Sequence, residues 1–123
     1  TTRLVGSEMC IRDRLFTPSE TRPNYIFQTF LYASIMCRQQ TLKVAPALLY
    51  IHRAASDSYS PVIEMGEPRQ PKIPVNNFTF FEDEFRKRLQ TLLEEIFSEN
   101  EPFTQTEDIK KCSYCDFKAI CKR

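Results

Sequence analysis

Three cysteines near the C-terminus are the residues of this sequence best suited to metal chemistry. Cys112, Cys115 and Cys121 follow the pattern Cys-x2-Cys-x5-Cys. A two-residue spacer allows two thiolates to turn toward the same metal centre. Zinc ribbons need two such pairs and this chain has only one, whereas an iron–sulfur cluster takes thiolate ligands from four positions. We therefore predict that these three cysteines are ligands of an iron–sulfur cluster.

The other two cysteines are poor candidates for a fourth ligand. Cys10 lies in an atypical N-terminal segment, and Cys37 falls on the apolar stripe of an expected helix, where a core role explains it better. The fourth ligand is therefore expected outside this chain. The odd cysteine count and the lack of a secretion signal favour a reducing cytoplasm over a disulfide framework. The plainer alternatives are three reduced surface cysteines, or one disulfide with one free thiol.

A glutamine and a tyrosine form the second group that could do chemistry. Gln28 and Tyr32 are four residues apart, so both project from one face of a helix. Gln28 and Cys37 are about half a turn apart around the helix axis, which separates this pair from the core stripe. Such a pair can hydrogen-bond a substrate or position a neighbouring catalytic group, although a solvated polar face is the more common explanation.

Two elements are expected to position this pair. Residues 24–40 are predicted to form a helix, because their apolar residues recur at helical spacing. The core stripe consists of Ile26, Phe30, Ala33 and Cys37, with Phe27, Leu31 and Ile35 beside it. Residues 44–52 form an apolar, partly β-branched run, which predicts a strand covered on both faces. Pro46 near its start favours either an edge position there or a strand that begins later.

A proline-rich stretch separates this strand from the next helix. Residues 56–77 contain four of the eight prolines and are predicted to be a loop, with short strands at 59–65 and 72–76. Thr79 and Glu82 then have the spacing of a capping box, in which each side chain bonds the other residue's backbone N–H. A helix is therefore expected to begin here.

This second helix is expected to continue to residue 97. Its predicted buried face consists of Phe81, Phe85, Leu89, Leu92, Leu93 and Ile96. The solvent side carries two i,i+4 ion pairs, Asp83–Lys87 and Glu84–Arg88. Residues 100–106 are polar and are expected to link this helix to the cysteine segment.

The helix with its Gln–Tyr pair, the strand at 47–51 and the cysteine pattern together resemble the end of a RecB-like PD-(D/E)XK nuclease. The resemblance covers residues 24–123 and is closest to the AddB-type subunit of bacterial helicase–nucleases, which has an iron–sulfur staple. It implies that Gln28 and Tyr32 help to organise the active site and the DNA. It also implies that the three C-terminal cysteines join one cysteine from far upstream around a [4Fe-4S] cluster.

The catalytic motif of such nucleases is missing from this sequence. Their chemistry needs Mg²⁺ held by an Asp and by an Asp or Glu on a strand, with a Lys two residues later. No such motif precedes Gln28. The strings Asp108-x-Lys110 and Asp116-x-Lys118 do not lie on apolar strands and are interpreted as chance. His52, the only histidine, has no catalytic partner and is expected to be structural, so this chain alone should not cleave DNA.

The expected fold class is α/β, in the form of an α+β fragment. It would be an incomplete restriction-endonuclease-like core of long helix, strand and long helix, followed by a cysteine-rich metal-cluster segment. Residues 4–14 resemble the peptide encoded by read-through of sequencing-adapter DNA, so residues 1–14 are expected to be non-native and disordered. The plainer alternative is a disordered natural terminus. Residues 15–103 would be the C-terminal part of the nuclease domain and residues 104–123 the cluster-binding tail.

The composition limits the function classes that remain. The net charge of +1 gives no overall electrostatic case for nucleic acid, and no apolar run is long enough to span a membrane. A local basic patch surrounds the cysteines and would offset the charge of a thiolate cluster. It comprises Lys110, Lys111, Lys118, Lys122 and Arg123.

By resemblance, the parent protein is a DNA exonuclease subunit that works with an AddA-type helicase–nuclease partner in the repair of double-strand breaks by recombination. One rival is a compact CRISPR-associated nuclease, which shares both motifs, although the roughly 80 residues between Tyr32 and Cys112 are more than expected there. Another rival is a non-enzymatic, metal-stapled module that binds nucleic acid through its basic tail, with Tyr114 and Phe117 free to stack on bases.

Overall fold

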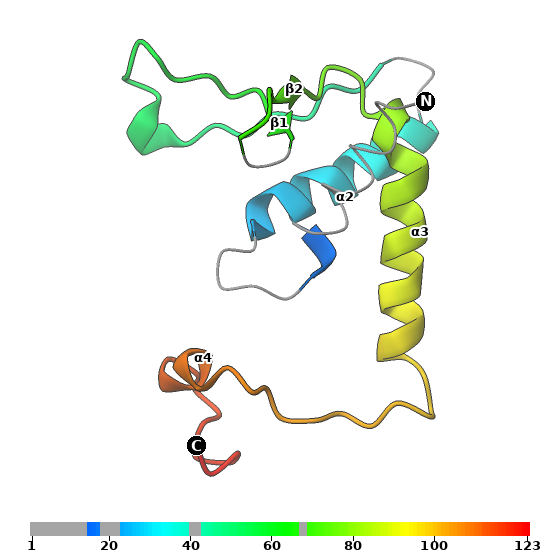
Figure 1. Ribbon diagram of the computed structural model, residues 1–123, viewed down its shortest axis with the longest axis vertical. Coiled ribbons are helices and arrows are strands. Elements are labelled where there is room, and N and C mark those ends of the chain that lie inside the picture. Colours follow the sequence, from blue (N-terminus) through cyan, green and yellow to red (C-terminus); the bar gives the residue numbers. More distant parts are fainter. Residues whose placement is uncertain (1–14, 18–22, 40–42, 67–68) are drawn as a thin grey trace. The chain divides into compact units, whose positions relative to one another are not determined.

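A computed structural model describes residues 15–17, 23–39, 43–66 and 69–123 of the chain (Figure 1). The expectations for residues 1–14 therefore lie outside the described residues. The chain divides into two compact units, Thr1–Leu93 and Glu94–Arg123, and each is considered by itself. The described residues form helices and one two-stranded sheet, which is consistent with an α+β fold. None of the helices in these ranges is long and apolar enough to cross a membrane.

Helix α2 spans Asn24–Gln39 and confirms the helix predicted from the apolar spacing. It begins directly after Pro23, whose carbonyl accepts the N–H of Phe27 at 3.1 Å. A proline fits this position because its missing N–H would have no partner in the first helical turn. Phe30 and Ala33 are buried as predicted, whereas Ile35, expected beside the stripe, is 46% exposed.

Helix α3 spans Thr79–Ile96, but it does not begin with the predicted capping box. Asn77 provides the local bond instead, since its side-chain Oδ1 accepts the N–H of Thr79 at 3.1 Å. The Glu82 carboxylate turns away from the helix start and bonds Ser34 of α2 at 3.2 Å. The capping-box prediction was wrong because a buried hydroxyl and two arginines compete for the carboxylate that the box would need.

The buried face of α3 is confined to its first half. Phe81 and Phe85 are buried as predicted, but Leu93 and Ile96 are more than 40% exposed. The predicted pair Glu84–Arg88 forms at 2.7 Å. Asp83 pairs with Arg86 at 2.9 Å rather than with Lys87.

The prediction of a strand over residues 44–52 is wrong. The structure has one isolated antiparallel bridge there, between Ala47 and Val62, and then a 3-10 turn, η2, at Ile51–Arg53. Proline explains the difference, because the facing segment carries Pro61 and the run itself carries Pro46, and neither residue has an N–H to donate to a ladder. The run is therefore exposed at its end, with Ile51 at 84%.

Short strands do form inside the predicted proline-rich loop. β1 (Glu64–Met65) pairs antiparallel with β2 (Ile73–Pro74), with Met65 opposite Ile73. The backbones next to this strand pair come close, since a Cβ on Gly66 would lie 3.1 Å from the Cα of Lys72. A side chain at this position would push the two strands apart, so glycine suits it.

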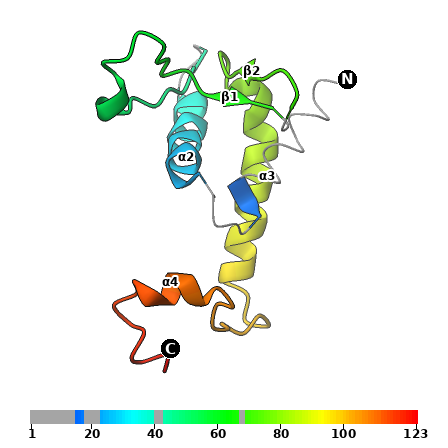
Figure 2. The same cartoon turned by 60° about the vertical axis from the view of Figure 1, so that its left-hand side comes forward.

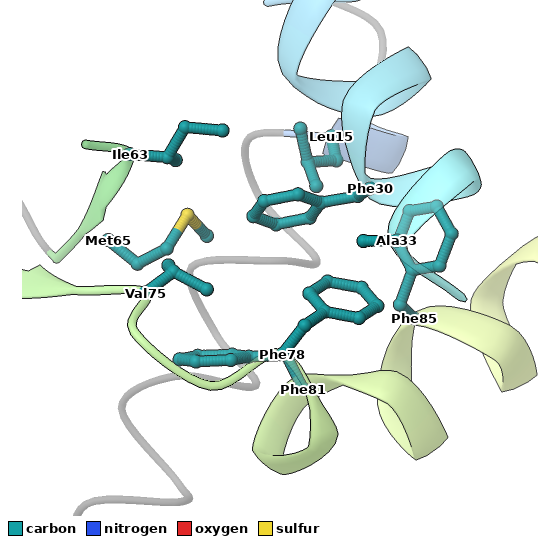
Figure 3. Close-up of a cluster of buried hydrophobic side chains, with 9 residues drawn as sticks. All are labelled: Leu15, Phe30, Ala33, Ile63, Met65, Val75, Phe78, Phe81 and Phe85. Carbon is teal, nitrogen blue, oxygen red and sulfur yellow. The ribbon is translucent and has the colours of Figure 1, made fainter. Parts of the chain in front are cut away.

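Phenylalanine rings form the centre of the hydrophobic core (Figure 3). Phe30 of α2 and Phe78, which precedes α3, have ring centroids 4.9 Å apart. Phe85 lies within 5.6–6.0 Å of four other rings, those of Phe16, Phe27, Phe30 and Phe78. Ile63, Met65 and Val75 from the β1–β2 region complete the buried set together with Leu15, Ala33 and Phe81.

The second unit contains one short helix, α4, at Ile109–Ser113. Residues 97–108 form no helix or strand, which agrees with the polar linker expected at 100–106. The chain after α4 continues through a series of turns to its end.

The ring cluster predicts a large loss of stability for Phe85→Ala. Truncating a fully buried phenylalanine removes its transfer energy and leaves a cavity, so the free energy of unfolding should fall by about 3–5 kcal/mol. Urea denaturation followed by circular dichroism measures this change. Phe80→Ala is the matched control, because Phe80 lies on the same helix and is 70% exposed, and a change of no more than about 0.5 kcal/mol is expected there. Similar losses in both variants would contradict this description of the core.

Candidate functional site

Gln28 and Tyr32 lie on the solvent face of α2 and touch each other. The Gln28 side-chain amide donates a hydrogen bond to the Tyr32 hydroxyl at 3.3 Å. Tyr32 is 58% exposed, while Phe30 and Ala33 on the opposite side of the helix are buried. The structure therefore places the pair on the face that the helical spacing predicted, away from the core.

This face continues along the helix on both sides of the pair. Tyr25, Ile35 and Met36 are also exposed, and positions 25, 28, 32, 35 and 36 follow one another at helical spacing. The sequence of α2 contains no aspartate or glutamate, and its single charged residue is Arg38. A polyanion can approach this face without meeting a carboxylate of the helix, and it finds an amide and a hydroxyl there as hydrogen-bonding groups.

A polar network on another side of α2 fixes the helix against α3. Three groups reach the same carboxylate oxygen, Oε1 of Glu82: the Ser34 hydroxyl at 3.2 Å, Arg86 Nε at 3.5 Å and Arg38 Nε at 3.9 Å. Ser34 is buried and the Glu82 side chain is only 14% exposed. These directional contacts set the rotation of α2 about its axis, and therefore which residues it presents to solvent. Sequence reasoning missed the network because Glu82 has the spacing of a capping residue.

The three C-terminal cysteines lie close together in sequence on α4 and the turns that follow. Cys112 is in α4, and its thiol contacts the Asp108 carbonyl at 3.7 Å. The N–H of Cys115 bonds the Cys112 carbonyl at 3.2 Å, and the N–H of Cys121 bonds the Phe117 carbonyl at 3.2 Å. All three thiols are free, and none of them is fully buried.

These thiols match an iron–sulfur cluster in chemical type but do not yet surround a centre. Within the described ranges, no group of three cysteine, histidine or acidic side chains is arranged to hold a metal ion. The last turn is tied down by Gln105, whose side chain donates to the Cys121 carbonyl and accepts from Arg123 Nε. Cluster binding by Cys112, Cys115 and Cys121 therefore stays a prediction.

The structure places no strand-borne catalytic motif in the described part of the chain. Glu64 is the only acidic residue in its strands, and the position two residues later is Gly66 rather than lysine. Asp108 and Lys110 lie at the start of α4, and the string at residues 116–118 lies in turns. Neither string is on a strand, which agrees with the interpretation of both as chance.

His52 lies in the exposed turn η2 instead of at the end of a strand. Its ring centroid is 6.1 Å from that of Tyr50, in an edge-on arrangement. Among the described residues, no cysteine, serine or carboxylate is paired with His52, and its expected structural role stays a prediction.

A family model describes most of this chain. The model of the PD-(D/E)XK nuclease superfamily matches residues 14–122, which include α2, α3 and the cysteine segment. The chain belongs to the PD-(D/E)XK nuclease superfamily. No curated protein and no solved structure matches it significantly.

Membership in the PD-(D/E)XK nuclease superfamily indicates which kind of substrate the exposed face of α2 should be compared with. Nuclease activity is the chemistry of this superfamily, and its substrate backbone is a chain of phosphates. Helix α2, which carries no acidic residue, exposes the Gln28–Tyr32 pair and so offers hydrogen-bonding groups without a carboxylate of its own.

The Glu82 network predicts that Glu82→Ala lowers the free energy of unfolding by about 1–2 kcal/mol, because a buried hydroxyl loses its charged acceptor. Glu84→Ala is the matched control, since it removes a 2.7 Å pair with Arg88 within the same helix. Intrahelical surface pairs contribute about 0.3–0.5 kcal/mol. Urea denaturation at low salt compares the two variants. Equal losses would show that Glu82 does not join the helices.

Proposed function

We propose that this chain is the DNA-engaging C-terminal part of a Mg²⁺-dependent deoxyribonuclease that resects DNA ends during the repair of double-strand breaks. The observation that carries the proposal is the hydrogen-bonded Gln28–Tyr32 pair, exposed on a helix without carboxylates in a chain of this superfamily. The resemblance to AddB-type proteins adds the helicase–nuclease setting, with an AddA-type partner subunit and a cytoplasmic location.

The two side chains have complementary roles in this proposal. The Tyr32 hydroxyl accepts from the Gln28 amide and keeps its own proton to donate to a phosphate oxygen. The second N–H of the Gln28 amide is left for a further acceptor, either the DNA or a neighbouring catalytic group. Because each side chain restricts the other, the pair would orient the phosphate with little loss of side-chain freedom.

The metal ligands of the nuclease would be carboxylates outside this chain, because no Asp…(Asp/Glu)-x-Lys motif precedes Gln28 in the sequence. Mg²⁺ supplies activated water and stabilisation of the charge on the phosphate when it is bound. The residues of this chain would bind and orient the DNA for that chemistry.

The cysteine segment is proposed to hold a [4Fe-4S] cluster. Cys112, Cys115 and Cys121 would provide three thiolates and a cysteine outside this chain the fourth, which together make the four ligands that such a cluster takes. The cluster would be structural, because joining distant parts of a chain reduces the entropy of the unfolded state. The lysines around it would offset its negative charge.

A second candidate is a non-enzymatic module that binds nucleic acid. Tyr114 and Phe117 are 93% and 66% exposed in the same lysine-rich segment, and exposed rings beside cations suit stacking on bases. The cleavage assay below separates the two functions, because a non-enzymatic module would bind DNA and show no Mg²⁺-dependent cleavage.

The proposed nuclease predicts a specific defect for Gln28→Ala. The 123-residue chain alone should leave linear DNA intact, whereas the longer gene product with strand carboxylates before Leu15 should degrade it with Mg²⁺ and not with a chelator. In that product Gln28→Ala should lower the cleavage rate at saturating DNA at least about tenfold, since a misplaced phosphate reacts slowly. Its melting temperature should change little, because Gln28 is exposed.

Gln39→Ala is the control for this measurement, because Gln39 is an exposed glutamine at the other end of α2. Full activity of Gln28→Ala, or equal losses in the two variants, would overturn the role of the pair. Absence of Mg²⁺-dependent cleavage by the longer product would overturn the nuclease proposal itself.

The proposed cluster predicts that Cys115→Ser lowers both the iron content and the melting temperature of the longer product. Anaerobically prepared protein should contain iron and sulfide and show a broad visible absorption, and the variant should lose this signal. Cys37→Ser is the control, since Cys37 packs beside the core and should leave the iron content unchanged. Zinc without iron in the purified protein would contradict the proposed cofactor.

A further inference from the structure

The segment from Ala47 to Val62 forms a long loop of the first unit (Figures 1 and 2). Its base is closed by the Ala47–Val62 bridge and by a 2.9 Å bond from the Leu48 N–H to the Pro61 carbonyl. Four consecutive backbone hydrogen bonds of 2.9–3.2 Å then continue through the turns at residues 50–59. The loop therefore has a defined conformation although most of its side chains are exposed.

The hydroxyl of Tyr59 holds the backbone that leads into the tip of this loop. Tyr59 donates its hydroxyl proton to the Leu48 carbonyl at 2.5 Å, and the same oxygen accepts the Tyr50 N–H at 2.7 Å. A hydroxyl is both donor and acceptor, so it can replace the neighbouring strand that this stretch lacks. The side chain of Tyr59 thus fixes the backbone directly before the tip.

The tip itself, Tyr50–Arg53, combines an aromatic ring, a cation and an exposed apolar side chain. The Arg53 guanidinium carbon lies 5.7 Å from the centroid of the Tyr50 ring, a cation–π distance. Ile51 is 84% exposed. The sequence from Lys43 to Ser56 contains no acidic residue, so the tip is positive or neutral throughout.

We propose that this tip contacts unpaired bases at a DNA end. The inference rests on the proposed function, since it assigns a strand-binding element to the same nuclease. Bases stack on arginine planes and aromatic faces, and apolar side chains insert between base steps. In this assignment the Arg53 guanidinium, which lies over the Tyr50 ring at a cation–π distance, carries a base on its outer face, and Ile51 inserts beside it.

Unpaired DNA fits the tip better than duplex DNA or protein. Duplex DNA presents phosphates to such a loop and keeps its bases stacked, so it would use the charge of Arg53 and not its plane, and Ile51 could insert only at the cost of unstacking a base step. A purely apolar protein contact would gain nothing from the positive charge or from the missing carboxylates. Unpaired bases can use the aromatic ring, the plane of the cation and the apolar side chain together.

The test is fluorescence anisotropy with the full 123-residue chain and labelled oligonucleotides, one single-stranded and one blunt duplex. Ile51→Ser and Arg53→Lys should each weaken single-strand binding about tenfold, the scale of a lost stacking contact. Duplex binding should change little. Arg53→Lys keeps the charge and removes the plane, so retained single-strand affinity in this variant would overturn the stacking assignment.

Two further variants complete the test. Tyr59→Phe leaves the tip side chains intact and removes the hydroxyl that fixes the loop, so it should also weaken single-strand binding. Lys87→Ala, an exposed cation of α3, is the control and should leave the affinity unchanged. Equal losses for single-stranded and duplex DNA would overturn the proposal. Unchanged affinities in all tip variants would also overturn it and would point to a protein partner.

These results are distinguishable from a failure of the nuclease proposal. Loss of single-strand affinity in tip variants supports the tip whether or not the longer product cleaves DNA. Conversely, Mg²⁺-dependent cleavage that responds to Gln28→Ala, together with tip variants that bind normally, would overturn the tip alone.

Discussion

The packing of phenylalanine rings between α2 and α3 is the constraint on which the rest of the first unit depends. Phe85 lies within about 6 Å of four other rings, and Phe30 and Phe78 are fully buried beside it. Aromatic rings at these distances prefer tilted and edge-on contacts, as seen here, so the cluster restricts both distance and orientation. Because this packing uses one face of α2, the helix has to present its opposite face, with Gln28 and Tyr32, to solvent.

Apolar packing alone would leave the rotation of α2 loosely defined, because the hydrophobic effect has no direction. The contacts of Glu82 with Ser34, Arg38 and Arg86 supply that direction. Both arginines are largely exposed, so their contribution is screened, and the buried Ser34 hydroxyl makes the stronger demand on geometry. A site built on such a rigid helix can hold an amide and a hydroxyl in place before any substrate arrives.

Periodicity predicted both long helices and the solvent face of the Gln28–Tyr32 pair, since these depend on local geometry. The prediction of a strand at 44–52 failed because an apolar run does not show whether the segment that faces it can donate hydrogen bonds. Pro61 cannot, and the hydroxyl of Tyr59 takes over from eleven residues away. The capping-box prediction for Glu82 failed for a similar reason, because its partners on α2, Arg38 and Ser34, are 44 and 48 residues away in the sequence. Superfamily membership was predicted from motifs and is confirmed, while the cysteine ligands stay a prediction.

Superfamily membership and the lack of a strand-borne acidic motif in the described chain are compatible if the two halves of a nuclease site have opposite charge requirements. The metal half needs carboxylates to hold a cation, whereas the half that contacts DNA has to avoid them, because phosphates repel acidic groups. α2 and the tip Tyr50–Arg53 both lack acidic residues, although the chain as a whole is nearly neutral. The acids are instead concentrated on α3 and after it, where arginines neutralise several of them. Under the proposed function, this segregation would place α2 and the tip, rather than α3, in the half of the site that contacts the substrate.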